Sequence, residues 1–285
     1  MNSTGTLIVA ISLMIIMFGM GLSLTRADFQ RVAKNPKAVL LGLINQLIFL
    51  PIIGYVLVTT LNLAPEIAIG IMILAACPGG ATSNVVALLA KGDTALSVTL
   101  TAISSIITII TIPFIVSFAL LKFSGEGEEI SLNIIQMIGQ LLMIVIVPVF
   151  LGMLIRARAT NFALKMGKPV RIASVILLVL IITGLFIKEK HNIIPYFQQA
   201  GLPTILLTGI SMMLGYLTAS GLKLRKPQAI SIAVESGIQN SGLAITIAVV
   251  TLKNTAFGIA GAIYTLVMYL GAFVIILYGR YAKSR

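Results

Sequence analysis

Charged side chains are scarce in this sequence, and acidic ones are the scarcest. Only 10% of the 285 residues are charged and eight are acidic, whereas 58% are hydrophobic. A typical soluble domain has about 25% charged residues. This composition excludes an ordinary soluble domain and predicts a chain whose side chains mostly face a lipid bilayer.

Cysteine and histidine each occur once. The single cysteine, Cys77, excludes an intrachain disulfide, and its apolar surroundings indicate a buried, inert thiol. A metalloid carrier that uses a membrane cysteine stays open as an alternative, and Cys77→Ala tests it. His191 follows Lys190 in a predicted loop, so no serine–histidine pair is expected within the membrane. An intramembrane aspartyl protease needs two membrane carboxylates, whereas we find one, so we do not expect an enzyme.

Nine apolar runs are long enough to cross a bilayer as helices. They lie near 6–25, 38–60, 66–90, 94–121, 131–155, 170–187, 203–221, 228–251 and 255–279. The segment Met1–Gly5 before the first run carries neither Lys nor Arg, so we expect an uncleaved span and not a signal peptide. The sequence therefore predicts an all-α polytopic membrane protein with nine transmembrane helices.

Basic residues are distributed unequally among the connections. Sixteen of the 20 Lys and Arg residues fall in the odd-numbered connections or in the C-terminal tail, and four fall on the other side. Because positive residues gather on the cytoplasmic side, we expect an external N-terminus and a cytoplasmic C-terminus in the cell (inner) membrane. The same bias explains the net charge of +12 without a nucleic-acid partner.

Two apolar runs contain residues that disfavour a membrane helix. The third run holds Cys77-Pro78-Gly79-Gly80 ahead of a polar triplet, and the eighth holds glycines and polar residues over 235–242. One further run follows each break, so the breaks occupy corresponding places in two halves. This predicts an inverted-repeat transporter, with repeats at 1–123 (four helices) and 128–285 (five helices) beside the polar loop 124–129. Simple kinks with small-residue packing are the alternative.

Glu235 is the only acidic residue well inside a predicted span. A carboxylate at that depth costs at least about 2.5 kcal/mol, and no Lys or Arg lies in a span core to pair with it. The sequence therefore predicts a bound cation or a proton as its partner. Neutral oxygen donors of the kind that hard cations prefer are supplied by Gln46, Ser83, Asn84, Ser97, Thr101, Gln239 and Asn240.

Several motifs resemble one known family over nearly the whole chain, the bile acid:sodium symporters. The motifs are Ile16-Met17-Phe18-Gly19-Met20-Gly21 with Asp28-Phe29, Cys77-Pro78-Gly79-Gly80, Ser83-Asn84, Lys91-Gly92-Asp93 with Ala95-Leu96-Ser97-Val98, and the segment 235–242. The resemblance implies a panel domain from the runs near 6–25, 131–155 and 170–187, and a core domain from the remainder.

The resemblance also implies two sodium sites in the core, where the broken helices cross. The first comprises Ser83, Asn84, Ser97, Thr101 and Glu235. The second comprises Gln46, Glu235 and Gln239, with backbone carbonyls at Ser236 and Ile238. Where the family has Gly-Gly-Thr-Ala-Ser-Asn, this chain has Ala81 before Thr82, so one hydroxyl moves by a position. Substrate contacts are expected from Ala81, Thr82, Asn84, Asn240 and Ser241.

Together these features predict a sodium-coupled symporter that imports an organic anion, such as a bile acid or a small carboxylate, by alternating access. Na⁺ is the coupling ion, no other cofactor is expected, and the partners are sodium, substrate and lipid around a monomer. A proton-coupled or uniport carrier, in which Glu235 titrates, is the alternative. A channel is also open, and single-channel current distinguishes it.

Overall fold

A computed structural model of the chain describes residues 3–124 and 132–281. Most of the predicted polar loop at 124–129 lies outside the described residues, as do residues 1–2 and the basic tail residues Lys283 and Arg285. The helices, with η marking a π-helical turn, are α1 (Ser3–Ser23), α2 (Arg26–Lys34), α3 (Pro36–Ile44), η1 (Asn45–Phe49), α4 (Leu50–Thr60), α5 (Pro65–Ala76), α6 (Ala81–Leu89), α7 (Thr94–Phe123), α8 (Ile134–Leu141), η2 (Leu142–Ile146), α9 (Val147–Arg158), α10 (Thr160–Lys188), α11 (Ile193–Gly221), α12 (Lys226–Gly237), α13 (Ser241–Thr246), η3 (Ile247–Thr251) and α14 (Ala256–Tyr281).

Seven continuous helical stretches are long and apolar enough to cross a membrane. They are Thr4–Ser23, Pro36–Thr60, Thr94–Phe123, Ile134–Arg158, Thr160–Lys188, Ile193–Gly221 and Ala256–Tyr281. The third and eighth predicted runs are each divided into shorter helices, α5 with α6 and α12 with α13–η3. The described part is thus an all-helical, polytopic arrangement.

Two helices begin well before the spans predicted near 170–187 and 203–221. Helix α10 begins at Thr160 and α11 at Ile193, and each continues through an internal proline, Pro169 or Pro203. Those starting positions were wrong because polar residues and proline mark the edge of an apolar run but not the end of a helix. Neighbouring groups in a membrane protein compensate for the hydrogen bond that proline removes.

The connection after α1 forms the short helix α2, where the sequence predicted only a loop. Asp28, expected in that loop, is 5% exposed. Its carboxylate accepts hydrogen bonds of 2.7 Å from the backbone N–H and the hydroxyl of Thr25, and it pairs with Arg31 at 2.5 Å. Thr99 of α7 donates to the Asp28 carbonyl at 2.9 Å. The bonds with Thr25 form the cap that begins α2, and the bond from Thr99 attaches α2 to α7.

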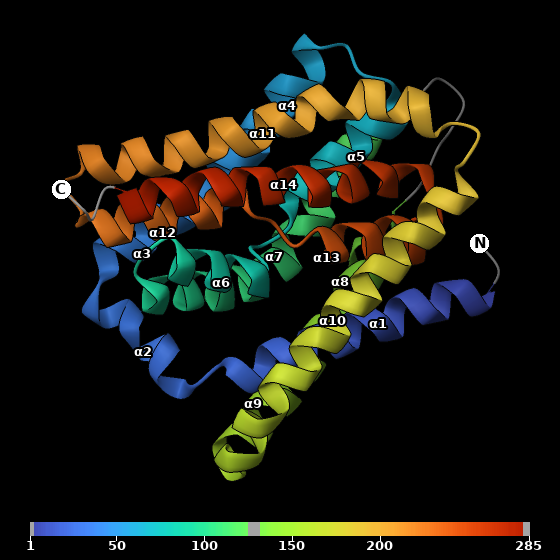
Figure 1. The fold of residues 1–285 in the computed structure, drawn as a ribbon. Coiled ribbons are helices and arrows are strands. Elements are labelled where there is room, and N and C mark those ends of the chain that lie inside the picture. Colours follow the sequence, from blue (N-terminus) through green and yellow to red (C-terminus); the bar gives the residue numbers. More distant parts are fainter. Residues whose placement is uncertain (1–2, 125–131, 282–285) are drawn as a thin grey trace.

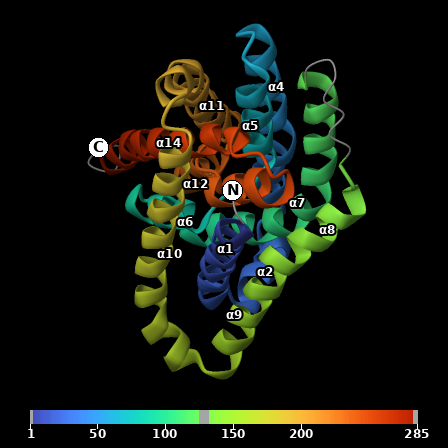
Figure 2. The same cartoon turned by 90° about the vertical axis from the view of Figure 1, so that its right-hand side faces the viewer.

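Helices α9 and α10 flank α1 on one side of the molecule, while α3–α7 and α11–α14 form the larger part (Figures 1 and 2). Helices α2 and α8 both pack against α7. Glycines allow the close approach of α1 and α9. A Cβ at Gly21 would overlap the backbone of Val149, and one at Gly152 would overlap the Phe18 carbonyl. The glycine motif of the first run therefore has a packing role in helix association.

Helix α5 and the broken pair α12–α13 form the interior of the larger part. Every residue from Ile67 to Ala76 is buried, as is every residue from Ala229 to Val249. Helices α4, α7, α11 and α14 surround them (Figure 1). Glu235, in the last turn of α12, is therefore held in the centre of the protein and away from lipid.

Candidate functional site

The two broken segments meet where the chain leaves the helix. Gly79 and Gln239 form an antiparallel β-bridge, and the Asn240 N–H donates to the Pro78 carbonyl at 2.8 Å. Figure 1 shows the connections α5–α6 and α12–α13 crossing near the middle of the molecule. Unwound backbone inside a membrane needs such internal partners, so each break satisfies the polar groups of the other.

The carboxylate of Glu235 lies directly beside this crossing. Its Oε1 accepts hydrogen bonds from the Ser83 and Ser97 hydroxyls, each at 2.5 Å, and Thr101 Oγ1 lies 2.9 Å from Oε2. Ser83 belongs to α6, whereas Ser97 and Thr101 lie one turn apart on α7. The consecutive helices α6 and α7 and the distant helix α12 therefore supply one oxygen cluster.

Close packing at Gly79 defines one wall of the cluster. A Cβ at this position would overlap Glu235 Oε2 and would come 3.0 Å from Gln46 Nε2. Glycine is therefore required here because the carboxylate and the amide occupy the space of a side chain. The second glycine, Gly80, is less restricted, with its nearest neighbour at 3.6 Å.

Acceptor oxygens outnumber the available protons in this cluster. Each hydroxyl carries one proton but lies near two or more acceptors. Ser97 Oγ is 2.9 Å from Asn84 Oδ1 as well as 2.5 Å from Glu235, and Ser83 Oγ is 2.6 Å from the Gly80 carbonyl. Thr101 Oγ1 is 3.3 Å from Asn84 Oδ1. A cluster with more acceptor oxygens than hydrogen-bond donors can accommodate a hard cation or one further proton.

No basic side chain neutralises the carboxylate. Among the buried residues of the described segments there is neither Lys nor Arg. Within 3–124 and 132–281, no three His, Cys, Asp or Glu side chains lie together as a metal group. The donors are carboxylate, amide and hydroxyl oxygens, which suit an alkali or alkaline-earth ion better than a transition metal.

A second group of polar atoms surrounds the backbone carbonyls of Glu235 and Ser236. Gln46, from the π-helical turn η1, donates through Nε2 to the Glu235 carbonyl at 3.3 Å. Gln239 donates to the carbonyls of Glu235 at 3.1 Å and Ser236 at 2.8 Å. The Oε1 atoms of Gln46 and Gln239 are buried without a hydrogen-bond partner. Ile238 is buried in the break itself, with extended backbone.

Buried amide oxygens without partners are costly, about 1–3 kcal/mol each. Two such oxygens beside an unwound backbone indicate a place that a cation can fill. The structure therefore brings together the residues expected for both ion sites, around a single carboxylate.

The residues expected to contact substrate are only partly gathered. Ala81, Thr82 and Asn84 lie half-buried in the first turns of α6. Asn240 begins α13: its Oδ1 accepts from the Leu243 N–H at 3.0 Å, and its Nδ2 lies 4.0 Å from the sulfur of Met17 in α1.

Ser241 differs from the other residues of this set. Its Oγ accepts a 2.7 Å hydrogen bond from Thr265, and the residue is 2% exposed. The side chain thus faces α14 and is not grouped with Thr82 and Asn84.

Two polar residues that support the site were missed by the sequence analysis. The Tyr264 hydroxyl donates at 2.7 Å to the Gly237 carbonyl, at the end of α12. Asn45 donates to the Leu41 carbonyl at 2.9 Å and to Thr218 at 3.1 Å, and so links η1 with α11. Asn45 could have been identified from the sequence, because the polar pair Asn45-Gln46 interrupts an apolar run. A single tyrosine in α14 gives no such signal for Tyr264.

The sequence matches the "Sodium Bile acid symporter family" over residues 10–196. The chain belongs to this family. It is 34% identical over 244 residues to "Uncharacterized sodium-dependent transporter YocS" of Bacillus subtilis, covering 84% of this chain and 73% of the relative. It is 29% identical over 243 residues to the human "Ileal sodium/bile acid cotransporter", covering 84% of this chain and 68% of the relative.

A plant relative is more distant and longer. The chain is 26% identical over 265 residues to "Probable sodium/metabolite cotransporter BASS2, chloroplastic" of rice, with 93% of this chain aligned but 62% of the relative. Members of the family are sodium-coupled transporters and not enzymes, which confirms those two expectations and Na⁺ as the coupling ion.

Proposed function

We propose that the protein is a symporter that uses sodium to import an organic anion by alternating access. The observation that carries this proposal is the Glu235 carboxylate, buried without a basic partner and surrounded by hydroxyl oxygens at the crossing of two broken helices. Sodium entering this cluster would neutralise the carboxylate and hold α6, α7 and α12 together.

The first sodium ion is assigned to the oxygens of Ser83, Asn84, Ser97, Thr101 and Glu235. The second is assigned to Gln46, Glu235 and Gln239, with the carbonyls of Ser236 and Ile238. The two unpartnered glutamine oxygens support the second assignment.

The proposed architecture has nine membrane crossings in two inverted repeats, 1–123 and 128–285. Helices α1, α8–α9 and α10 form the panel, and the other spans form the core. The packing of α1 against α9 and α10 supports the panel. Movement of the core past the panel would expose the site alternately to the two sides of the membrane.

The substrate site is proposed at the beginnings of α6 and α13, the second of which packs against α1. Helix N-termini carry partial positive charge and attract a carboxylate or sulfonate. Ala81, Thr82, Asn84 and Asn240 form the contacts, and Ser241 contributes after release from Thr265. If two sodium ions accompany one monovalent anion, each cycle moves one net positive charge inward, driven by about 2.3 kcal/mol per 100 mV.

We further propose a monomer with its N-terminus outside and its C-terminus in the cytoplasm. Because Cys77 is the only cysteine and is buried, Cys77→Ala provides a background for labelling. Cysteines placed at Lys190 and Lys165 should then react with an impermeant reagent from opposite sides of the membrane. Reaction of both from the same side contradicts this topology.

The transport proposal is tested with purified protein in liposomes. An inward sodium gradient should drive uptake of labelled taurocholate or of a small carboxylate such as succinate, and each active anion should stimulate uptake of ²²Na⁺. Uptake that follows a pH gradient and ignores sodium would instead establish the proton-coupled carrier. Cys77→Ala serves as the matched control and should retain full transport.

A further inference from the structure

An apolar groove lies between α7 on one side and α1, α2, α8 and α9 on the other. Its volume is about 520 Å³, and its lining includes Leu24, Phe29, Ile106, Leu142 and Phe150. Three of these side chains are also widely exposed: Ile106 by 50%, Leu142 by 42% and Phe150 by 62%. The groove is therefore open along its side, toward the space that lipid occupies around a membrane protein.

Two arginines each lie one helical turn from a residue that lines this groove. Arg26 lies one helical turn before Phe29 on α2, and Arg156 lies one turn after the lining residue Met153 on α9. Side chains three residues apart share a helix face, so each arginine lies on the same helix face as a residue that lines the groove. Within the described segments neither arginine forms a salt bridge, whereas Arg31 is paired with Asp28.

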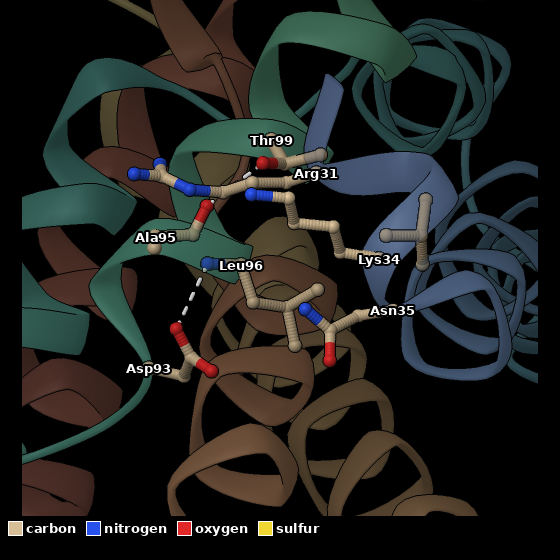
Figure 3. A pocket seen from close by; sticks show the side chains of 8 residues that line it. Arg31, Lys34, Asn35, Asp93, Ala95, Leu96 and Thr99 are labelled. Carbon is tan, nitrogen blue, oxygen red and sulfur yellow. Dashed lines mark hydrogen bonds between the residues drawn. The ribbon is translucent and has the colours of Figure 1, made fainter. Parts of the chain in front are cut away.

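A second, smaller hollow of about 170 Å³ is lined by the cations Arg31 and Lys34 of α2 and by the acid Asp93. Figure 3 shows Arg31 and Lys34 reaching from α2 across the first turns of α7, toward Ala95 and Thr99. Thr99 lines this hollow, and Ala102, one turn further along α7, lines the apolar groove. A polar hollow of mixed charge and the apolar groove thus adjoin along one helix.

We propose that the groove binds one anionic phospholipid of the leaflet that faces these arginines. An acyl chain lies in the apolar groove, and the headgroup phosphate binds Arg26 and Arg156. A hydrocarbon chain is the occupant that matches an apolar groove open to the bilayer core. Guanidinium groups bind phosphate through paired N–H donors, and basic sites between membrane helices are suited to anionic headgroups.

The proposed lipid site is separate from the proposed sodium cluster. Its wall on α7 includes Ala102 and Ser105, which follow the sodium-site residue Thr101, but none of the residues assigned to sodium lines the groove. The lipid would contact the proposed core through α7 and the proposed panel through α1 and α9. Binding is therefore expected without sodium, and loss of the sodium site leaves it intact.

The test is native mass spectrometry of the purified full chain titrated with palmitoyl-oleoyl phosphatidylglycerol and, separately, with the phosphatidylcholine of the same chains. Wild type should prefer the anionic lipid. The double variant Arg26→Gln/Arg156→Gln should lose about 30-fold in affinity for it, at about fivefold for each cation, and keep its affinity for phosphatidylcholine. Arg158→Gln, at the same end of α9 but on another face, is the matched control and should bind as wild type.

A second pair of variants tests the groove. Ile106→Trp fills it and should weaken both lipids, whereas Phe114→Trp, also exposed on α7 but outside the groove, should weaken neither. Cooperative thermal unfolding shows that each variant is folded. An unchanged lipid preference in the double arginine variant overturns the proposal, as does unchanged binding in Ile106→Trp. Displacement of the lipid by glycerol 3-phosphate at equal concentration also overturns it, because the site would then bind a free anion.

Discussion

Replacement of Glu235 by glutamine separates the charge of the site from its shape. The amide retains Oε1, so Ser83 and Ser97 keep the acceptor that lies 2.5 Å from each hydroxyl. The new NH₂ group takes the place of Oε2, which lies 2.9 Å from Thr101 Oγ1, and this hydroxyl oxygen can accept its hydrogen. The packing and hydrogen bonds therefore survive, and only the negative charge is lost.

The expected effect on stability changes sign with the cation in solution. In potassium chloride the variant should be at least as stable as wild type, because an unpaired acidic group at mid-membrane depth costs at least about 2.5 kcal/mol. In sodium chloride at about 100 times the dissociation constant, wild type should gain about 2.7 kcal/mol. At about 2–4 °C per kcal/mol, this gain corresponds to roughly 5–10 °C in melting temperature.

The assay is thermal unfolding of detergent-purified protein in sodium and potassium chloride at equal ionic strength. Wild type should show the sodium-specific increase, and Glu235→Gln should show none. An equal sodium-specific increase in the variant would refute the assignment of the carboxylate to the ion. A wild type that ignores sodium but becomes more stable as the pH falls would identify a proton as the partner.

Three further predictions concern packing and the breaks in the helices. Gly79→Ala should abolish sodium-specific stabilisation in the same thermal assay, because the added methyl group overlaps the site carboxylate, whereas Gly80→Ala should preserve it. Tyr264→Phe should lower the free energy of unfolding by about 1–3 kcal/mol, since it leaves a buried carbonyl without its donor; equal denaturation midpoints would contradict this. Gly152→Ala should lower the melting temperature by separating α1 from α9, whereas Gly139→Ala, which meets no atom within 4 Å, should not.

Residues that conflict with a lipid environment made the breaks and the central carboxylate predictable. Proline followed by two glycines stands out in the third run, and Glu235 is the single acid well inside a run. Against an apolar background each such residue requires a partner, and the structure supplies those partners at the β-bridge and the hydroxyl cluster. The family resemblance then indicated which neutral residues would join them.

The direction of individual side chains was less predictable. Ser241 was expected among the substrate contacts, yet it accepts a hydrogen bond from Thr265 on a helix that has no distinguishing sequence signal. Asp28 was expected in a loop, because a nine-residue amphipathic helix resembles a charged connection in composition. Such features depend on partners far away in the sequence, which periodicity and composition do not identify.

The oxygen cluster joins residues that are far apart along the chain. Ser83 and Glu235 are separated by 152 positions, and Gln46 and Glu235 by 189. During synthesis the N-terminal part emerges first, so the hydroxyls of α6 and α7 are already in the membrane when α12 arrives with its acid. Sodium binding at the proposed site then becomes possible only after most of the chain is inserted. The coupling ion can thus report on, and stabilise, the last step of assembly.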